Sequence, residues 1–534
     1  MSTTDTTPSA GSLSTPQEQS TSERPRVWRA FLVVWVLLSA LCASWAVATP
    51  IGASPDEPAH IVKAASVARG QFIGTPSADG HRVTVPAYVA RTQDDTCFAF
   101  HQERPAACGL APLTDPGALT TSYTTAGLYN PVYYLLVGWP TLLLHDTSGI
   151  YAMRIVSGIV TALFAALAFA VLWGLRRRAI PVLGFAVAVT PMLLFLGGSV
   201  NPNGVEATAT LAVFAGILAV VLDPDRSRLL SRAMIVLASG AVAVNTRGLS
   251  PLWVLLAILI PFVLVPWRTV LALLRKPAVI AAAVGVVLAT IAALAWTVGT
   301  NSLHNAVDNP DQTPQSFIGV GTNPLSGFFI TLVRTAEYGH GLIGIFGWLD
   351  TPAPPEVYFI WAAMIGIVLV AALVLLRSRM LVFAWVLFGA FILLPPVIQA
   401  AYITGGGVIW QGRYNMPLFL CLIVGLAVVL ATRIPADWAT ATWRRFAWLV
   451  VIVLAFGQLY AFENTLRRYS VTPIGSLKQF LFGTPPWAPP GGNLLSLLVF
   501  AALVVVACWL ALRAVRRVGD ADKPVTPVEP PAAI

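Results

Sequence analysis

The apolar residues of this chain come in long unbroken blocks, without the two-residue alternation that is typical of a half-buried strand. A helix needs about 20 consecutive apolar residues to cross the hydrocarbon core of a bilayer. Blocks of about that length recur down the sequence, so we expect an all-α polytopic membrane protein with about twelve transmembrane helices. They are expected at Trp28–Ala48, Ile150–Leu175, Ala179–Val200, Val205–Leu222, Ala233–Arg247, Ser250–Trp267, Pro277–Thr300, Glu356–Leu376, Met380–Ile403, Asn415–Thr432, Phe446–Phe462 and Leu494–Leu512.

Composition and charge agree with this pattern. Of the 534 residues, 57% are hydrophobic and only 11% are charged, whereas soluble domains carry about 25% charged residues. The formal net charge is +9, but the basic residues lie in the turns between apolar blocks and form no patch interleaved with aromatic residues. We therefore expect membrane lipid as a partner and no nucleic acid.

The basic clusters also predict an orientation. If the N-terminus is cytoplasmic, Arg176–Arg178, Arg377/Arg379 and Arg513/Arg516/Arg517 all lie in cytoplasmic turns or tails, as the positive-inside rule requires. We expect a multi-pass protein of the plasma membrane with both termini in the cytoplasm.

The predicted topology divides the chain into two tails and one transmembrane domain. Residues 1–27, rich in Ser, Thr and Pro, form a disordered cytoplasmic tail; residues 28–512 form the transmembrane domain; and residues 513–534 form a second cytoplasmic tail. Three large loops face the outside, at residues 49–149, 301–355 and 463–493. Material for a functional site is therefore expected on the extracytoplasmic face alone.

One apolar segment in the first outer loop, Pro131–Leu144, is not counted as a span. It is short and contains Pro140, and a crossing there would place Arg176–Arg178 outside. We expect a helix on the outer membrane surface. The same loop holds Cys97 and Cys108, for which an outer location permits a disulfide; the sequence leaves that pairing open.

The first candidate site follows the first span, at Asp56 and Glu57. An amphipathic helix is expected after Pro58 and should end at Gly70. Carboxylates at its start lie at the membrane–water interface, where the pKa and basicity of a general base can be tuned. The alternative is N-capping together with interface solvation, and both interpretations remain open.

Two arginines lie at outer span ends. An Arg within a span costs about 2.5–3.5 kcal/mol at a helix centre, so Arg247 either extends to the interface or meets an anion. Arg413 follows the glycine run at Gly405–Gly407. Because a guanidinium can engage two phosphate oxygens, the pair suits a lipid phosphate or diphosphate, and surface anchoring is the alternative.

Two other outer polar residues have structural interpretations that are at least as favoured as functional ones. Glu206 is expected to begin the fourth span, where a helix N-terminus favours it, and Asp350 lies in an aromatic turn that we interpret as structural. The candidates for substrate binding are His60, Arg247, Arg413, Tyr414, Asn203 and Glu206.

Three motifs resemble one known family. Pro55–His60, Gly344–Asp350 and Gln411–Pro417 are similar, in this order, to the bacterial membrane-protein family called domain of unknown function 2142. The likeness covers roughly residues 28–512. That family in turn resembles the C-type glycosyltransferase superfamily, in which an acidic residue follows the first span and a helix then lies on the membrane surface.

The resemblance implies a reaction. A sugar on a polyprenyl phosphate is transferred, with inversion, to a glycan, polymer or protein acceptor of the cell envelope outside the membrane. Asp56 is implied as general base, with Glu57 orienting it or binding a metal, and Arg247 lies where relatives carry a phosphate-binding Lys. Relatives often have Asp after the third span, where this chain has Asn201 and Asn203. We therefore expect no tightly bound metal and leave a weakly bound divalent cation open.

Two other functions remain open from the sequence. A transporter or flippase for a lipid-linked glycan needs polar residues along a path through the bilayer, and the predicted spans contain few of them. A non-catalytic subunit of envelope assembly would keep the fold without the chemistry, because fold does not decide function.

Overall fold

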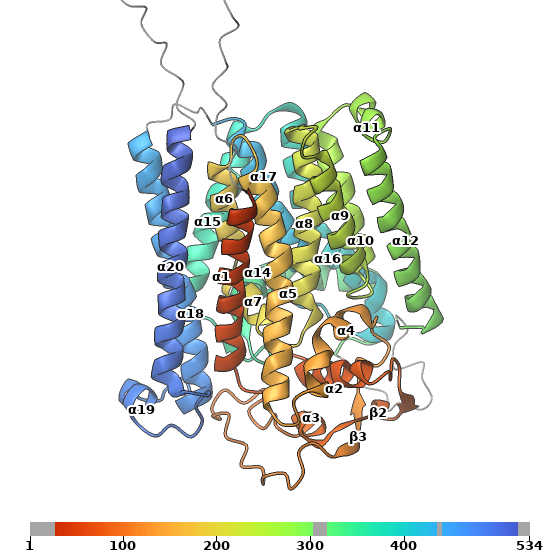
Figure 1. Ribbon diagram of the computed structural model, residues 1–534, viewed down its shortest axis with the longest axis vertical. Coiled ribbons are helices and arrows are strands. Elements are labelled where there is room, and N and C mark those ends of the chain that lie inside the picture. Colours follow the sequence, from red (N-terminus) through yellow and green to blue (C-terminus); the bar gives the residue numbers. More distant parts are fainter. Residues whose placement is uncertain (1–26, 303–317, 435–439, 522–534) are drawn as a thin grey trace, which may run out of the picture.

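The computed structural model describes residues 27–302, 318–434 and 440–521. Long helices run side by side in a bundle, with the N-terminal start of α1 and the end of α20 at the same end (Figure 1). We call this end the tail end and the opposite end, which carries the large loops, the loop end. Most of the expected disordered tail, residues 1–26, lies outside the described part of the chain, as do residues 522–534.

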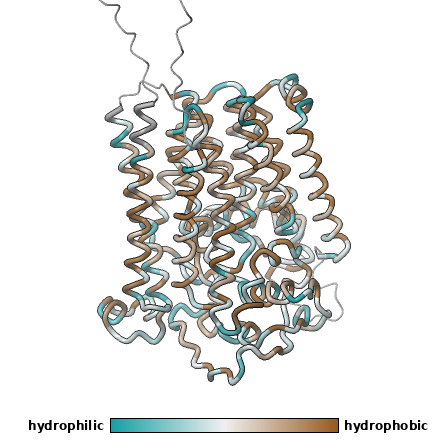
Figure 2. Tube along the Cα trace, in the orientation of Figure 1, coloured by the Kyte–Doolittle hydropathy of each residue, from teal (hydrophilic) through white to brown (hydrophobic). Residues whose placement is uncertain are grey.

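Within the described ranges, nine helices are long and apolar enough to cross a membrane. Hydrophobic residues run along them, and hydrophilic residues gather toward the two ends of the bundle (Figure 2). The chain is therefore a multi-pass, mostly helical membrane protein. The nine are α1 (Val27–Ala48), α5 (Ser148–Trp173), α8 (Pro202–Leu222), α12 (Pro277–Gly299), α15 (Pro355–Leu375), α16 (Ser378–Gly406), α17 (Met416–Ala431) together with the 3₁₀ helix η5 (Gly412–Asn415) that leads into it, α18 (Thr440–Val471) and α20 (Gly492–Ala521).

Twelve spans were expected, and the described part of the chain contains nine, or ten if one bent pair of helices is counted as a span. The bent pair is α6 (Ala179–Ala188) and α7 (Pro191–Gly197), which meet at 66°. The bend falls at Thr190, whose hydroxyl donates to the carbonyl of Leu342 at 2.8 Å. Since Pro191 has no backbone N–H, the helix restarts there as a new helix instead of continuing.

The expected fifth and sixth spans are short helices. They are α9 (Leu229–Val244), of 16 residues, and α10 (Ser250–Leu259), which continues into the 3₁₀ helix η3 (Ile260–Leu264). At about 1.5 Å per residue, α9 is shorter than the hydrocarbon core is thick. The reason is visible in the sequence, because the turn at Asn245–Leu249 ends the first apolar run and Pro261 and Pro266 end the second.

The loop end is not entirely helical, which corrects the all-α expectation. The first loop contains α2 (Glu57–Ala68), α3 (Ala87–Ala90), the 3₁₀ helix η1 (Arg91–Gln93) and an antiparallel sheet in the order β1 (Thr75–Ser77), β2 (Gly80–Pro86), β3 (Leu119–Thr124). In β2 the side chains alternate, with Val83 and Val85 buried and Arg82 and Thr84 exposed. This is the two-residue pattern of a half-buried strand, in a loop too polar to stand out beside the apolar blocks.

The expected surface helix is present and is not a span. It consists of α4 (Val132–Gly138) and the 3₁₀ helix η2 (Trp139–Leu142). Leu135, Leu136 and Trp139 are exposed, whereas Tyr133 and Tyr134 are buried against the protein. An apolar exposed face of this kind suits a helix that lies in the membrane interface.

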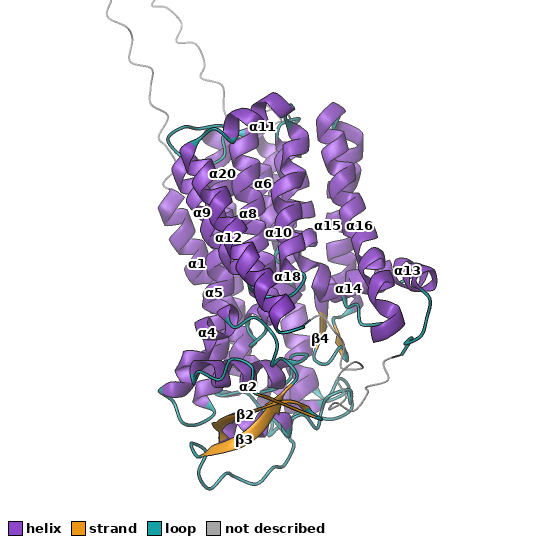
Figure 3. Cartoon of the chain, turned by 90° about the vertical axis from the view of Figure 1, so that its right-hand side faces the viewer, coloured by secondary structure: helices purple, strands orange, loops and turns teal. Residues whose placement is uncertain are grey.

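The remaining elements lie around the two ends of the bundle. The tail end carries α11 (Trp267–Leu273), and α13 (Pro324–Val333) lies to one side of the bundle (Figure 3). The expected third loop is shorter than residues 463–493, because α18 continues as a helix to Val471. The second large loop contains α13 (Pro324–Val333), α14 (Thr335–Gly344), β4 (Ile345–Phe346) and β5 (Thr351–Pro352), and the third contains α19 (Leu477–Phe482).

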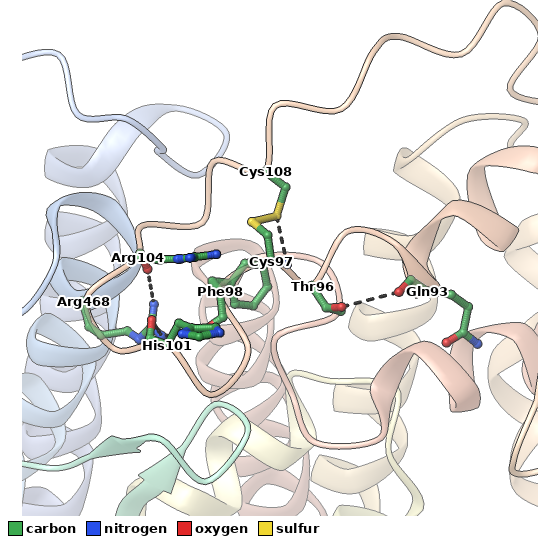
Figure 4. Close-up of a disulfide and its surroundings, with 8 residues drawn as sticks. All are labelled: Gln93, Thr96, Cys97, Phe98, His101, Arg104, Cys108 and Arg468. Carbon is green, nitrogen blue, oxygen red and sulfur yellow. Dashed lines mark hydrogen bonds between the residues drawn. A yellow bond between two sulfur atoms is a disulfide. The ribbon is translucent and has the colours of Figure 1, made fainter.

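The disulfide that the sequence left open is formed. Cys97 and Cys108 are joined, with their Cα atoms 5.5 Å apart (Figure 4). Arg468 on α18 donates to the carbonyls of Phe98 at 3.0 Å, His101 at 2.9 Å and Arg104 at 2.8 Å. Arg468 thereby attaches the segment between Cys97 and Cys108 to the helix bundle.

Asp350 has the structural role that we expected. Its carboxylate accepts hydrogen bonds from the backbone N–H of Phe100 at 2.9 Å and from the hydroxyl of Thr351 at 3.0 Å. It also lies 3.4 Å from a guanidinium nitrogen of Arg468. These contacts connect the β4–β5 turn to the first loop and to α18.

Helix α2 is buried on every side, although the sequence suggested an amphipathic helix. All residues from Glu57 to Val67 are buried, because α4, the sheet and the bundle enclose them. The contact with α4 is close at Gly138, where a Cβ atom would lie 2.1 Å from the carbonyl oxygen of Ala64. Helix α4 therefore covers α2 and packs tightly against it.

We predict that Gly138→Ala destabilises the protein, because the added methyl group must push α4 away from α2. Overpacking of this kind costs about 1–3 kcal/mol, which should lower the thermal unfolding midpoint of the detergent-solubilised protein. Gly366→Ala on α15 is the matched control, since its Cβ would meet nothing within 4 Å and Ala favours a helix over Gly by about 0.5–1 kcal/mol. Equal midpoints for the two variants would contradict the close packing of α2 and α4.

Candidate functional site

The site begins at the turn between α1 and α2. The backbone of Asp56 is left-handed, with φ 63° and ψ 1°, a conformation that Asp tolerates better than most residues. This turn sends two consecutive carboxylates in opposite directions: the Glu57 side chain is fully buried, whereas that of Asp56 is 53% exposed. The Asp56 carboxylate accepts no hydrogen bond from the first turn of α2, all of which the structure describes. N-capping therefore does not account for it.

Glu57 forms a buried ion pair with Arg154 on α5. The two carboxylate oxygens accept from Nε at 2.7 Å and from Nη2 at 2.6 Å, and one of them also accepts from the backbone N–H of Val200 at 3.0 Å. Arg154 donates its other N–H groups to the carbonyls of Ala46 at 3.0 Å, Thr49 at 2.7 Å and Pro50 at 2.7 Å. All five donors of this guanidinium are thus in use, and the pair joins the ends of α1, α2, α5 and the turn before α8.

Asp56 forms a different kind of ion pair, with Arg413 on the 3₁₀ helix η5 (Gly412–Asn415). The distance from Nη2 to Oδ2 is 2.7 Å, and the Arg413 side chain is only 3% exposed. Its Nε and Nη1 atoms are buried and have no hydrogen-bond partner among the described residues. A buried cation with unpaired donors is costly, so this arginine has the capacity to bind a further anion.

Two arginines, Arg413 and Arg247, lie close to one aromatic ring. The Cζ atom of Arg247 lies 4.5 Å from the ring centroid of Tyr414, and that of Arg413 lies 5.2 Å from the same centroid. Guanidinium groups are attracted to aromatic rings at these distances. Tyr414 therefore keeps two positive charges close together that would otherwise repel each other.

Arg247 is connected to the start of α8. Its Nη1 donates to the side-chain oxygen of Asn203 and lies 3.5 Å from a carboxylate oxygen of Glu206. Ser250 completes the cluster, since its hydroxyl donates to Glu206 at 2.6 Å and accepts from the backbone N–H of Arg247 at 3.0 Å. Glu206 pairs with an arginine, and Asn201 is the residue that caps α8, through a 3.0 Å bond from the Asn203 N–H.

His60 lies one turn into α2 and is surrounded by tyrosines. Its Nδ1 is 2.8 Å from the hydroxyl of Tyr134, and its ring lies 5.6 Å from that of Tyr129. Burial lowers the pKa of His60 to about 4, and Arg247 and Arg413 also lower it, against an opposing effect of Asp56. The imidazole is therefore neutral at physiological pH, with one N–H donor and one acceptor nitrogen.

Lys63, one turn after His60, has a structural role that the sequence did not suggest. It is buried, and its ammonium group donates to the carbonyls of Phe72 and Gly127. Burial lowers the pKa of Lys63 to about 7. These bonds connect α2 to the loops on both sides of the sheet.

The structure brings the candidate residues into one region. Asp56 contacts Arg413, Arg413 and Arg247 share Tyr414, and Arg247 contacts Asn203 and Glu206. Sequence analysis missed Tyr129, a partly buried residue whose pKa is raised by burial, against an opposing effect of Arg247. Its position just before the surface helix was the signal available for it.

Residues 39–422 match the family described as predicted membrane protein (DUF2142). The chain belongs to this family. Among solved structures, the DUF2142 chain is similar to "Crystal Structure of ArnT from Cupriavidus metallidurans bound to Undecaprenyl phosphate", with 16% sequence identity and a TM-score of 0.39 over 93% of this chain and 76% of that one. No curated protein matches it in sequence.

The DUF2142 chain shows no group of three or more His, Cys, Asp or Glu side chains suited to a metal ion within the described ranges. Near the site, the oxygens of Glu57 are occupied by Arg154 and Val200, and Asp56 and Glu206 face arginines. These carboxylates are each paired with a cation of the protein itself. The expectation of no tightly bound metal stays a prediction.

We predict that Glu57→Gln strongly destabilises this DUF2142 protein. The change leaves the Arg154 charge buried without a counter-charge, and removal of one partner from a buried ion pair costs about 3–5 kcal/mol. Glu103→Gln is the control, because Glu103 pairs with His101 at the surface, where its side chain is 70% exposed. Denaturant unfolding of both variants tests this, and a Glu57→Gln midpoint equal to that of the control would show that the pair contributes little.

Proposed function

We propose that this protein is a membrane glycosyltransferase that moves a sugar from a polyprenyl-phosphate donor to a cell-envelope acceptor on the extracytoplasmic face, with inversion. The observation that supports this most is the pair of Asp56 and Arg413. A half-exposed carboxylate lies 2.7 Å from a buried guanidinium that keeps unpaired donors. A base and an anion-binding group are the two components that displacement of a phosphate leaving group by a hydroxyl requires.

The proposed step balances in atoms and charge. The acceptor hydroxyl oxygen attacks the anomeric carbon, and its proton passes to the Asp56 carboxylate. The bond between that carbon and the phosphate oxygen breaks, and the electron pair leaves with the polyprenyl phosphate. Attack opposite to the leaving group inverts the configuration at the anomeric carbon.

The two arginines are proposed to bind the phosphate. Arg413 has donors free for its oxygens, and Arg247, 18% exposed, lies beside the same Tyr414 ring. In the free protein Arg413 is occupied in part by Asp56, so an arriving phosphate competes for the same guanidinium. Binding of the donor would thereby release Asp56 to accept the hydroxyl proton.

The other candidate residues are proposed to position these groups. Glu57 holds the start of α2 through Arg154, His60 is a neutral hydrogen-bonding group near Tyr129, and Asn203 and Glu206 orient Arg247. The proposal needs no step through a metal. The proposal leaves open a divalent cation that binds weakly together with the phosphate.

We predict that Asp56→Asn abolishes sugar transfer while the protein remains folded. Loss of a general base lowers the rate by about 10²–10⁴-fold, and Asn is isosteric and can still accept a hydrogen bond from Arg413. Asp79→Asn, an exposed change in the β1–β2 turn, should keep full activity. The measurement is transfer from a polyprenyl-phosphate-linked hexose by purified protein in nanodiscs; an Asp56→Asn variant as active as Asp79→Asn would reject Asp56 as the base.

The orientation is testable in whole cells. In a background with Cys42, Cys421 and Cys508 replaced by Ala, we predict that Ala78→Cys in the β1–β2 turn reacts with a membrane-impermeant maleimide. Arg176→Cys at the tail end, where the Arg176 side chain is 87% exposed, should react only after the cells are permeabilised. The reverse labelling pattern would place Asp56 on the cytoplasmic side and would exclude the proposed reaction.

A further inference from the structure

Two buried amides at the start of α8 contact the proposed site on two sides. Asn201 is fully buried, and Asn203 is 3% exposed. The side-chain oxygen of Asn201 accepts from the backbone N–H of Asn203 at 3.0 Å and from the Asn203 side-chain nitrogen at 2.7 Å. The side-chain nitrogen of Asn201 donates to the carbonyl of Pro55 at 3.2 Å. The pair of amides thus reaches the residue directly before Asp56.

The orientation of both amides follows from their partners. A backbone N–H and a guanidinium only donate hydrogen bonds, so the atoms that face the Asn203 N–H and Arg247 are the amide oxygens. The amide nitrogens consequently face the Pro55 carbonyl and the Asn201 oxygen, which only accept. Donors and acceptors are therefore matched in each of these bonds.

The segment before α8 holds the residue on each side of Asp56. Asn201 binds the Pro55 carbonyl, and the backbone N–H of Val200 donates to the Glu57 carboxylate at 3.0 Å. Asp56 itself has a left-handed backbone, which persists at a residue other than glycine only where the surrounding structure fixes it. These two contacts supply that restraint from one short segment.

Capping of α8 explains only part of this arrangement. Because Pro202 follows it, Asn201 favours the extended backbone that it adopts, with φ −148° and ψ 126°. A residue in this position caps a helix through its side-chain oxygen, and Ser, Thr or Asp can also do so. The bond to Pro55 uses an amide nitrogen, which none of those three residues has. The amide of Asn201 therefore has a role besides capping.

The other end of the amide pair is one of the arginines proposed to bind the phosphate. The side-chain oxygen of Asn203 accepts from Nη1 of Arg247. Arg247 and Arg413 share the Tyr414 ring, and Arg413 pairs with Asp56. The contacts form a closed chain, whose members are, in order, Asp56, Arg413, Tyr414, Arg247, Asn203, Asn201 and Pro55.

The two halves of this closed chain respond differently to an arriving phosphate. Donor binding is proposed to separate Asp56 from Arg413, which opens the half that contains the two arginines. The half between Asn203 and Pro55 consists of neutral groups and has no cation for a phosphate to attract. It therefore still connects the Asp56 turn to the phosphate site when the donor is bound.

We propose that Asn201 is a positioning residue that, through Asn203, fixes the backbone of Asp56 relative to the phosphate-binding Arg247. This rests on the proposed function. A general base must lie within hydrogen-bond reach of the proton that it accepts, and a displacement of about 1 Å can lower the rate about 100-fold. Asn201 thus acts on the rate of transfer, whereas the arginines act on the affinity for the donor.

The test uses purified full-length protein in nanodiscs and two measurements. One is steady-state transfer from a polyprenyl-phosphate-linked hexose, and the other is the Kd of bare polyprenyl phosphate. Asn201→Ser and Asn201→Thr are both neutral, keep a cap for α8 and remove the amide nitrogen that binds Pro55. Each variant should lower kcat by about tenfold to 100-fold and leave the Kd unchanged, because Arg247 and Arg413 keep their own contacts.

The matched control is Asn323→Ser. Asn323 also caps a helix, since its side-chain oxygen accepts from the Ser326 N–H at 2.9 Å at the start of α13. It is exposed and lies outside the closed chain of contacts. We expect this variant to keep the wild-type kcat and Kd.

The outcomes separate this inference from the proposed function. A lower kcat with an unchanged Kd in the Asn201 variants supports the positioning role. A wild-type kcat in both variants, a loss of affinity as large as the loss of kcat, or failure of both variants to fold would each overturn it and leave Asn201 as a helix cap. Wild-type protein that transfers no sugar would instead reject the proposed function, and this inference with it.

Discussion

The ion pair between Glu57 and Arg154 is the interaction on which the loop end depends. Arg154 uses every donor of its guanidinium to hold Glu57 and three carbonyls at the end of α1. Burial of both charges is favourable only because the geometry is bidentate and the remaining groups are satisfied. The interaction therefore determines where α1 ends, how α2 begins and how both lie against α5.

The position of Asp56 follows from that constraint. With Glu57 directed inward, the left-handed backbone at Asp56 turns the preceding carboxylate toward the open side, where Arg413 meets it. Arg413 comes from a segment more than 350 residues away in sequence, and it is held by Tyr414 and by the close backbone contact between Gly412 and α14. Two neighbouring acidic residues thus have separate environments: Glu57 lies in a buried structural ion pair, and Asp56 lies half-exposed beside Arg413, where we propose the chemistry.

Sequence analysis predicted much of the helical framework and singled out charged residues that the structure brings together, for identifiable reasons. Apolar blocks of spanning length are unambiguous in α1, α5 and α12, and Pro140 together with the charge pattern identified the surface helix. The count of twelve spans was too high because it included the short apolar helices α9 and α10, and because hydropathy does not show that α6 and α7 bend at Thr190. The sheet was missed because its strands are short and lie in a loop.

The contacts within the site could not be predicted from the sequence alone. Asp56, Arg247 and Arg413 are recognisable as charges at span ends, but the sharing of Tyr414 by both arginines depends on packing between distant helices. Glu57 points inward to Arg154 and Asp56 points to the open side because the backbone at Asp56 is left-handed. One sequence does not specify that backbone conformation. No sequence pattern distinguishes the buried Lys63 from an ordinary charged helix residue, and Tyr129 is marked only by its position just before the surface helix.

The interior of the bundle bears on the choice between chemistry and transport. Every residue of α17 from Met416 to Ala431 is apolar or glycine and is buried, and beyond Glu206 the polar residues of α8 are Thr208 and Thr210. A carrier for a sugar or phosphate needs polar groups along its route, whereas these two central helices provide an apolar wall. The ionised groups near Asp56 instead lie at the loop end: at the start of α2, near the start of α5, near the start of α8, after α9 and before α17. Such a distribution suits a scaffold that holds a reaction site at one membrane surface, with substrates that arrive and leave on that same side.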